Sequence, residues 1–222
     1  MKRLLALLLA LCLFTGSALA FTFEELDKDE VLDPGLMDKE TISDWAQAEV
    51  YGALAAGLVP TFTGDPGYRD TITREQFAEL IVQNVETALD RDLTPASADT
   101  FTDTTNPAIL KAVQAGIVTG VGEGRFAPTT ATNREQIATM IARAVDFLEK
   151  DAQVDMTPNA GSLAGFTDAG QVSDWAAEGV GTLAANGIMG GTSATTLSPK
   201  NPCTVEQSIL LSWRTFNIFQ NL

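Results

Sequence analysis

A helix-start signal recurs three times in this chain of 222 residues, and it constrains the fold more than any other feature. Thr73-Arg-Glu-Gln76, Asn133-Arg-Glu-Gln136 and Thr204-Val-Glu-Gln207 each place a capping residue three positions before a glutamine. In such a capping box, the two side chains bond reciprocally to backbone N–H groups at a helix N-terminus. Apolar residues follow each signal at helical spacing, so the sequence predicts three similar amphipathic helices.

A shorter helix is expected before each of these signals, and in two copies the same tetrapeptide marks its start. Ser43-Asp-Trp-Ala46 returns letter for letter as Ser173-Asp-Trp-Ala176. Asp44 and Asp174 are the predicted N-caps, since a short side-chain oxygen can accept an orphan backbone N–H there.

A glycine marks the predicted end of each of these first helices. Gly57 and Gly187 stand twelve residues after the tryptophans, and Gly116 takes the same place in the middle copy. The middle copy has Thr104 where the tryptophan would be. Glycine adopts positive φ without steric cost, so it suits the position just after a helix.

The chain therefore reads as three helix–loop–helix repeats, over 21–90, 99–150 and 164–222, joined by polar, proline-containing linkers. One repeat alone buries little surface, whereas three together can share a core. We expect an all-α fold with a pseudo-threefold arrangement of the repeats. The second helices would form a central three-helix bundle, and the first helices would pack outside it.

Residues 1–20 have the features of a secretory signal peptide. Lys2 and Arg3 precede the apolar run Leu4–Phe14, and small residues lead to the expected cleavage site after Ala20. The apolar run is shorter than the roughly 20 residues that a membrane span needs. We therefore expect a secreted protein with no membrane segment after cleavage.

The composition argues against several classes of function. A formal net charge of −15 disfavours nucleic acid as a partner, and the absence of histidine removes the commonest general base and metal ligand. Cys203 would be the single cysteine after cleavage, so no intrachain disulfide is expected. The acidic stretch Asp27–Asp38 has Leu32 and Asp38 at the sixth and twelfth positions, where an EF-hand loop needs glycine and glutamate. We predict no metal site, no cofactor and no catalytic residues.

Four motifs in the middle repeat together resemble one known domain. Phe101-Thr-Asp103, Gly116-Ile-Val-Thr-Gly120, Gly124-Arg-Phe-Ala-Pro128 and Asn133-Arg-Glu-Gln136 follow one another as in an S-layer homology repeat. The third repeat is similar, and the first opens with the looser Phe21-Thr-Phe-Glu24. The resemblance implies non-covalent attachment to a bacterial cell wall, through grooves between repeats that bind an anionic, pyruvylated secondary cell-wall polysaccharide. Other surface-layer proteins are further candidate partners.

The resemblance also points to ligand-binding residues. The family's signature basic residue corresponds to Arg74 and Arg134, whereas the third repeat has Val205 there. A guanidinium matches a carboxylate bidentately, and free N–H groups at a helix N-terminus would also favour an anion. Trp45 and Trp175 are candidate platforms for sugar rings. Two structural alternatives stay open. The arginines could pair with nearby carboxylates, and the tryptophans could be core anchors. For the tryptophans we favour this structural role.

The leading hypothesis is therefore a non-catalytic wall-binding protein at the bacterial cell wall or surface. The alternative is a degenerate scaffold that mediates protein–protein contacts at the cell surface, which Val205 and the missing tryptophan of the middle repeat motivate. A secreted hydrolase has little support, because no constellation of catalytic residues is evident.

Overall fold

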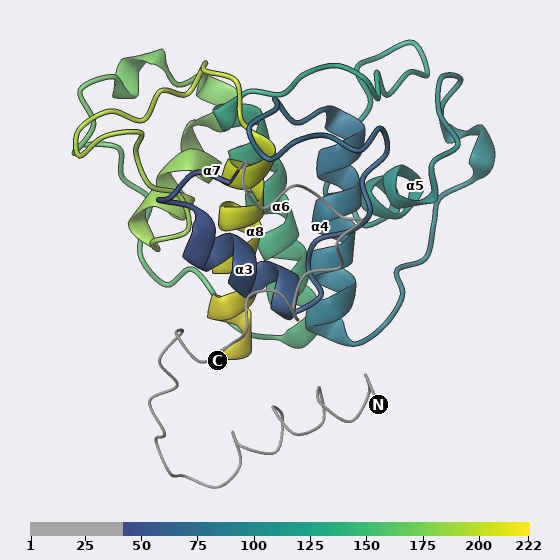
Figure 1. Ribbon diagram of the computed structural model, residues 1–222, viewed down its shortest axis with the longest axis horizontal. Coiled ribbons are helices and arrows are strands. Elements are labelled where there is room, and N and C mark those ends of the chain that lie inside the picture. The colour runs from purple at the N-terminus through teal and green to yellow at the C-terminus, as the bar shows by residue number, and fades with distance from the viewer. Residues whose placement is uncertain (1–41) are drawn as a thin grey trace, which may run out of the picture. The chain divides into compact units, whose positions relative to one another are not determined.

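The computed structural model describes residues 42–222, which form a helical structure (Figure 1). The α-helices are α3 (Gln47–Ala55), α4 (Arg74–Leu89), α5 (Pro107–Gln114), α6 (Arg134–Ala152), α7 (Asp174–Ala185) and α8 (Val205–Gln220). Short 3₁₀ turns lie at Ala98–Thr100 and Ala169–Gln171, and the described part contains isolated β-bridges but no strand. The all-α class is thus confirmed. The signal peptide, Phe21–Glu24 and Asp27–Asp38 lie outside the described residues.

The three capping boxes are present at the starts of α4, α6 and α8, with Thr73, Asn133 and Thr204 as N-caps. The prediction of Asp44 and Asp174 as N-caps was wrong. Ala46 precedes α3 and Ser173 precedes α7, and neither side chain accepts a capping bond. The Ser173 hydroxyl instead donates to the carboxylate of Glu135, so that side chain serves a contact between repeats.

The second helices of the three repeats, α4, α6 and α8, each contact the other two (Figure 1). Each first helix packs on the second helix of the preceding repeat: α5 on α4, α7 on α6, and α3 on α8. The last pair joins the two ends of the described chain. A helix that packs on a neighbouring repeat makes the stability of each repeat depend on the next.

Three backbone segments meet in a closed ring of hydrogen bonds just before the central helices. The N–H of Ile72 donates to Cys203 O at 3.0 Å, that of Cys203 to Thr132 O at 3.1 Å, and that of Thr132 to Ile72 O at 3.1 Å. All three residues are buried. Because each segment comes from a different repeat, the ring fixes the three repeats against one another.

A second set of bonds extends this ring to the helix starts. The first two N–H groups of an α-helix have no partner within the helix. Those of α4 donate to the carbonyls of Thr130 and Pro128, at 2.9 and 3.0 Å. The first two N–H groups of α6 donate to the carbonyls of Asn201 and Pro199 in the third repeat. Those of α8 donate to the carbonyls of Asp70 and Tyr68 in the first repeat. Every central helix therefore begins on a loop of another repeat.

None of the helices described over 42–222 has the length and apolar character needed to cross a membrane.

The glycine positions predicted from the sequence are confirmed, and they allow a stability test. Gly57, Gly116 and Gly187 have φ values of 71°, 76° and 75°. Gly116→Ala should lower the free energy of unfolding by about 1–2 kcal/mol, because a side chain at positive φ is strained. Chemical denaturation followed by circular dichroism measures the change.

Gly170→Ala is the matched control, since a Cβ there also meets open space but the backbone is not in the left-handed region. Its stability should stay within about 0.5 kcal/mol of the wild type. Equal losses in both variants would contradict the assignment of strain to φ.

Candidate functional site

Arg134, the first residue of α6, reaches into the third repeat. Its Nε donates to Leu197 O at 2.9 Å and its Nη2 to Gly190 O at 2.8 Å. The first residue of α4, Arg74, repeats the arrangement: its Nε donates to Phe126 O at 3.0 Å and its Nη2 to Thr119 O at 2.7 Å. Both guanidiniums therefore hold a loop of the next repeat by its carbonyls.

Within residues 42–222, neither of these two arginines has a carboxylate oxygen within 4.0 Å. The alternative of carboxylate pairing is therefore not observed among the described residues. Burial lowers the pKa of Arg74 and of Arg134, and Asp103 and Asp168 respectively act in the opposite direction. Arginine nevertheless stays protonated at neutral pH. Among the described residues, each guanidinium is compensated by carbonyl dipoles and by more distant charges.

The backbone at the helix starts does not add to an anion site, contrary to the expectation from sequence. The first two N–H groups of α6 donate to Asn201 and Pro199, and the third, that of Gln136, donates to the Asn133 side chain. The reason is that carbonyl groups of neighbouring repeats already accept hydrogen bonds from the N–H groups at the helix N-termini. An anion could contact the side chain of Arg134 but not these N–H groups.

A groove of about 420 Å³ lies where α8 meets α3, and we call it the α3–α8 groove. Arg134 and Trp45 both line it, together with Gly190, Gln207 and Arg214. The first repeat supplies Trp45, the second Arg134, and the third the remaining residues. The groove thus brings together one predicted arginine and one predicted tryptophan that stand far apart in the sequence.

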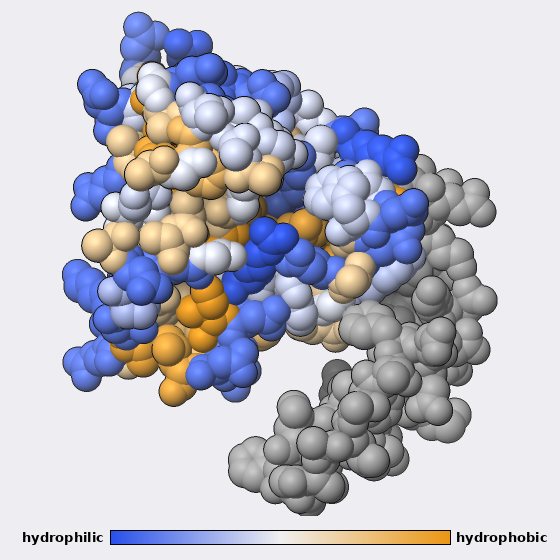
Figure 2. Space-filling model, turned by 90° about the vertical axis from the view of Figure 1, so that its left-hand side faces the viewer, coloured by the Kyte–Doolittle hydropathy of each residue, from blue (hydrophilic) through white to orange (hydrophobic). Residues whose placement is uncertain are grey.

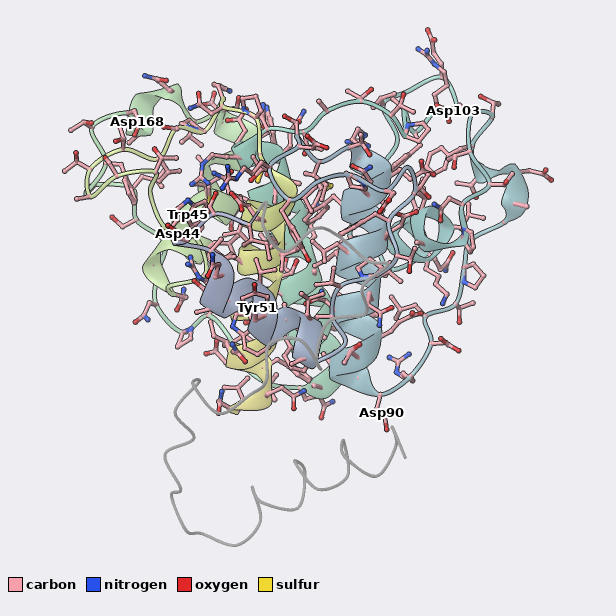
Figure 3. The ribbon with its side chains drawn as sticks, viewed as in Figure 1. Asp44, Trp45, Tyr51, Asp90, Asp103 and Asp168 are labelled. Carbon is pink, nitrogen blue, oxygen red and sulfur yellow. The ribbon has the colours of Figure 1, made fainter. Side chains whose placement is uncertain are left out.

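The two tryptophans are not core anchors. Trp45 and Trp175 are each 59% exposed, whereas the neighbouring Ala46 and Ala176 are fully buried. The interpretation that we favoured from sequence was therefore wrong, because the small residue beside each tryptophan fills the interior. Figure 3 shows Trp45 on the same side of the molecule as Asp168, with Asp103 on the opposite side. Figure 2 faces that side and shows apolar surface among hydrophilic side chains.

Trp175 and Arg74 do not line the α3–α8 groove. Trp175 lies near the start of α7, which packs on α6, and so holds the place that Trp45 holds on α3. The third helix pair, α4 with α5, lacks both residue types, because Val205 and Thr104 replace the arginine and the tryptophan. The three junctions are therefore chemically unequal.

A buried glutamate fastens two of the first helices, α7 and α3, to the preceding repeat. Glu135 is 2% exposed and accepts bonds from the N–H and hydroxyl of Ser173, and Lys200 also donates to it. Glu206, 3% exposed, accepts the same two bonds from Ser43, two residues before Trp45. Burial by itself would raise the pKa of Glu135, but Lys200 and Ser173 outweigh it and the pKa is lowered.

Comparison with known proteins matches residues 100–138 and 165–206 to the family described as the S-layer homology domain. The chain carries S-layer homology (SLH) sequence in these two segments. They contain the aspartates that fix the SLH loops. Asp103 accepts the backbone N–H groups of Phe126 and Ala127, and Asp168 those of Leu197 and Ser198. These backbone bonds are the main cause of the lowered pKa of each aspartate.

Three curated relatives are similar to this chain over a small part of their own length. An endoglucanase of Bacillus sp. (strain KSM-635) is 29% identical over 193 residues, which are 85% of the chain and 18% of the relative. The surface-layer 125 kDa protein of Lysinibacillus sphaericus is 28% identical over 81% of the chain and 15% of its own length. The S-layer protein of Bacillus thuringiensis subsp. finitimus is 29% identical over 60% and 15%. The chain thus spans less than a fifth of each relative.

Sequence reasoning missed three residues of the candidate site. Glu75, Glu135 and Glu206 occupy the third position of the three helix-start signals. This recurrence was the sign in the sequence that the glutamates could make similar contacts. Arg214 stands ten residues after its cap, as Arg143 does in α6. Its place in the groove depends on a partner in the first repeat, which no local pattern could indicate.

Glu135→Gln should lower the free energy of unfolding by about 2–4 kcal/mol at pH 7, because the amide leaves Lys200 without its carboxylate and places an N–H₂ group where donors point. The pKa of Glu135 is lowered below its ordinary 4.5 in the folded state. Its contribution is therefore complete above about pH 4.5 and is lost as pH falls through the folded pKa. Denaturation at pH 7 and pH 3 should show the difference from wild type shrinking.

Glu123→Gln is the control, because its side chain is 83% exposed. This variant should match the wild type within about 0.5 kcal/mol at both pH values. A Glu135→Gln penalty that stays the same at pH 3 would contradict the ionised contact.

Proposed function

We propose that this protein is a non-catalytic cell-wall-binding module, and that its α3–α8 groove binds an anionic, pyruvylated sugar of a secondary cell-wall polysaccharide. The three repeats, joined by the same hydrogen bonds in a closed ring, would form a pseudo-threefold platform with grooves between repeats. The observation that carries the proposal is the meeting of Arg134 and the exposed Trp45 in one groove.

Electrostatics favour an acidic ligand at this position. The chain has a formal net charge of −15, so a guanidinium without a direct carboxylate partner is a local exception. Two of the Arg134 nitrogens are held by carbonyls, which fixes its plane. A fixed guanidinium loses little entropy on binding and can receive a carboxylate with its remaining donors. The ligand would therefore carry a carboxylate at the floor of the groove.

Trp45 suits the remainder of such a ligand. A sugar ring has an apolar face, and an exposed indole offers a flat surface that costs little conformational entropy to order. The Glu206 contact to Ser43 holds the residues next to Trp45 in position. Ring stacking at one end and carboxylate binding at the other would together orient one acidic sugar.

The SLH segments and the surface-layer relatives support a role at the bacterial cell surface or wall. Among the relatives, the name endoglucanase describes a protein of which this chain matches 18%. We propose attachment rather than catalysis, with secondary cell-wall polysaccharide as the first partner and other surface-layer proteins as further partners. Arg74 and Trp175 would serve a second groove, between α6 and α7.

Cosedimentation with purified cell walls of the source organism tests the proposal. The wild type should sediment with intact walls and stay in solution once the secondary polymer is removed chemically. Trp45→Ala should weaken binding about tenfold, since loss of a stacked aromatic costs about 1.4 kcal/mol. Arg134→Lys, which keeps the charge but loses the planar fork, should weaken it further.

Arg91→Gln is the matched control, because this arginine pairs with Asp151 at a different pocket. Its binding should equal that of the wild type, and melting temperatures should establish that every variant is folded. Wild-type protein that fails to sediment with intact walls would contradict the proposal. Binding that is indifferent to both groove substitutions would favour the alternative, a scaffold for protein contacts.

A further inference from the structure

A second arginine lines the α3–α8 groove beside Arg134. Arg134 Nη2 donates to Gly190 O at 2.8 Å, and Arg214 Nη1 lies 3.9 Å from where a Cβ on Gly190 would stand. The two guanidiniums therefore flank one glycine of the groove wall. Two cations at such a place repel each other unless a negative group lies near them.

Glu49 of α3 provides part of that compensation. Its carboxylate accepts from Arg214 Nε at 2.7 Å and from Arg214 Nη2 at 2.6 Å, which is a bidentate pair. Arg214 Nη1 is left with one long contact of 3.5 Å to Ile188 O. The side chains of Arg214 and Glu49 are 33% and 29% exposed, so this ion pair is partly open to solvent, and Arg214 lines the groove.

We infer that Arg214, oriented by Glu49, is a second cationic contact that makes the α3–α8 groove selective for a carboxylate-bearing sugar. This inference rests on the proposed function and deepens it. A carboxylate between Arg134 and Arg214 receives donors from two directions, so the groove prefers the acid over a neutral sugar of the same shape. Glu49 sets the orientation of Arg214 and also weakens the attraction, because its negative charge opposes the ligand's.

The pair of Arg214 and Glu49 distinguishes this groove from its counterpart on α6. Arg143 stands where Arg214 does, ten residues after the cap, but Gly179 stands where Glu49 does, four residues after the tryptophan. The combination of arginine and glutamate therefore belongs to the junction that joins the first and third repeats. Substitutions at Glu49 and Arg214 address this groove alone.

Isothermal titration calorimetry, which measures the affinity of the whole chain for two small probes, tests the inference. One probe is a methyl N-acetylhexosaminide with a 4,6-linked pyruvate ketal, and the other is its 4,6-O-isopropylidene analogue, which has a methyl group in place of the carboxylate. Arg214→Gln should weaken binding of the acidic probe about tenfold and leave the neutral probe nearly unchanged. Glu49→Gln keeps an amide oxygen that can accept from Arg214 but removes an opposing charge, so it should strengthen binding of the acidic probe about threefold.

The opposite signs separate a ligand contact from a purely structural ion pair. If the pair only held α3 on α8, both substitutions would weaken both probes alike and lower the melting temperature, and that result would overturn the inference. Arg91→Gln, which removes an arginine from another ion pair, controls for net charge. The wild type could sediment with walls while Arg214→Gln binds the acidic probe as tightly as the wild type does. That result would overturn this inference but not the proposed function. Failure to sediment overturns both.

Discussion

The structure depends on the closed ring of backbone hydrogen bonds that joins Ile72, Thr132 and Cys203. Backbone N–H and carbonyl groups that are buried must find partners, and here each of these residues finds its partner in another repeat. The same requirement explains why each central helix begins on a neighbour's loop: its first N–H groups are orphans that the neighbour's carbonyls satisfy. Three repeats close the ring, whereas fewer would leave buried polar groups unpaired. The shared core of α4, α6 and α8 follows from this closure.

Closure also creates the site. The α3–α8 groove takes Trp45 from near the start of the described chain and Arg214 from near its end, and Arg134 comes from between them. No single repeat contains these residues, so the groove exists only when the first repeat is docked on the third. The contact of Glu206 with Ser43 and the pair of Arg214 with Glu49 hold that junction. The stability of this junction and the proposed binding are thus linked.

The helices could be predicted from sequence because their signals are local. Capping boxes, apolar spacing and the glycine at Gly116 each report on a few adjacent residues, and all three were confirmed. The errors concerned contacts between repeats. Ser173 was not recognised as the N-cap of α7 because its hydroxyl bonds to Glu135, and Trp45 was favoured as a core residue although it faces solvent. Apolar character alone cannot tell a buried aromatic side chain from one that a groove exposes.

Nuclear magnetic resonance of the indole groups tests the central claim most directly. The chain has three tryptophans, so a ¹⁵N-labelled sample should give three indole N–H signals, which single substitutions of Trp45, Trp175 and Trp213 would assign. Titration with solubilised fragments of the secondary polymer should shift the Trp45 signal. That of Trp213, which is packed against the core with its ring close to Gly52, should stay in place. Fragments that bind the protein without moving the Trp45 signal would contradict the assignment of the α3–α8 groove as the binding site.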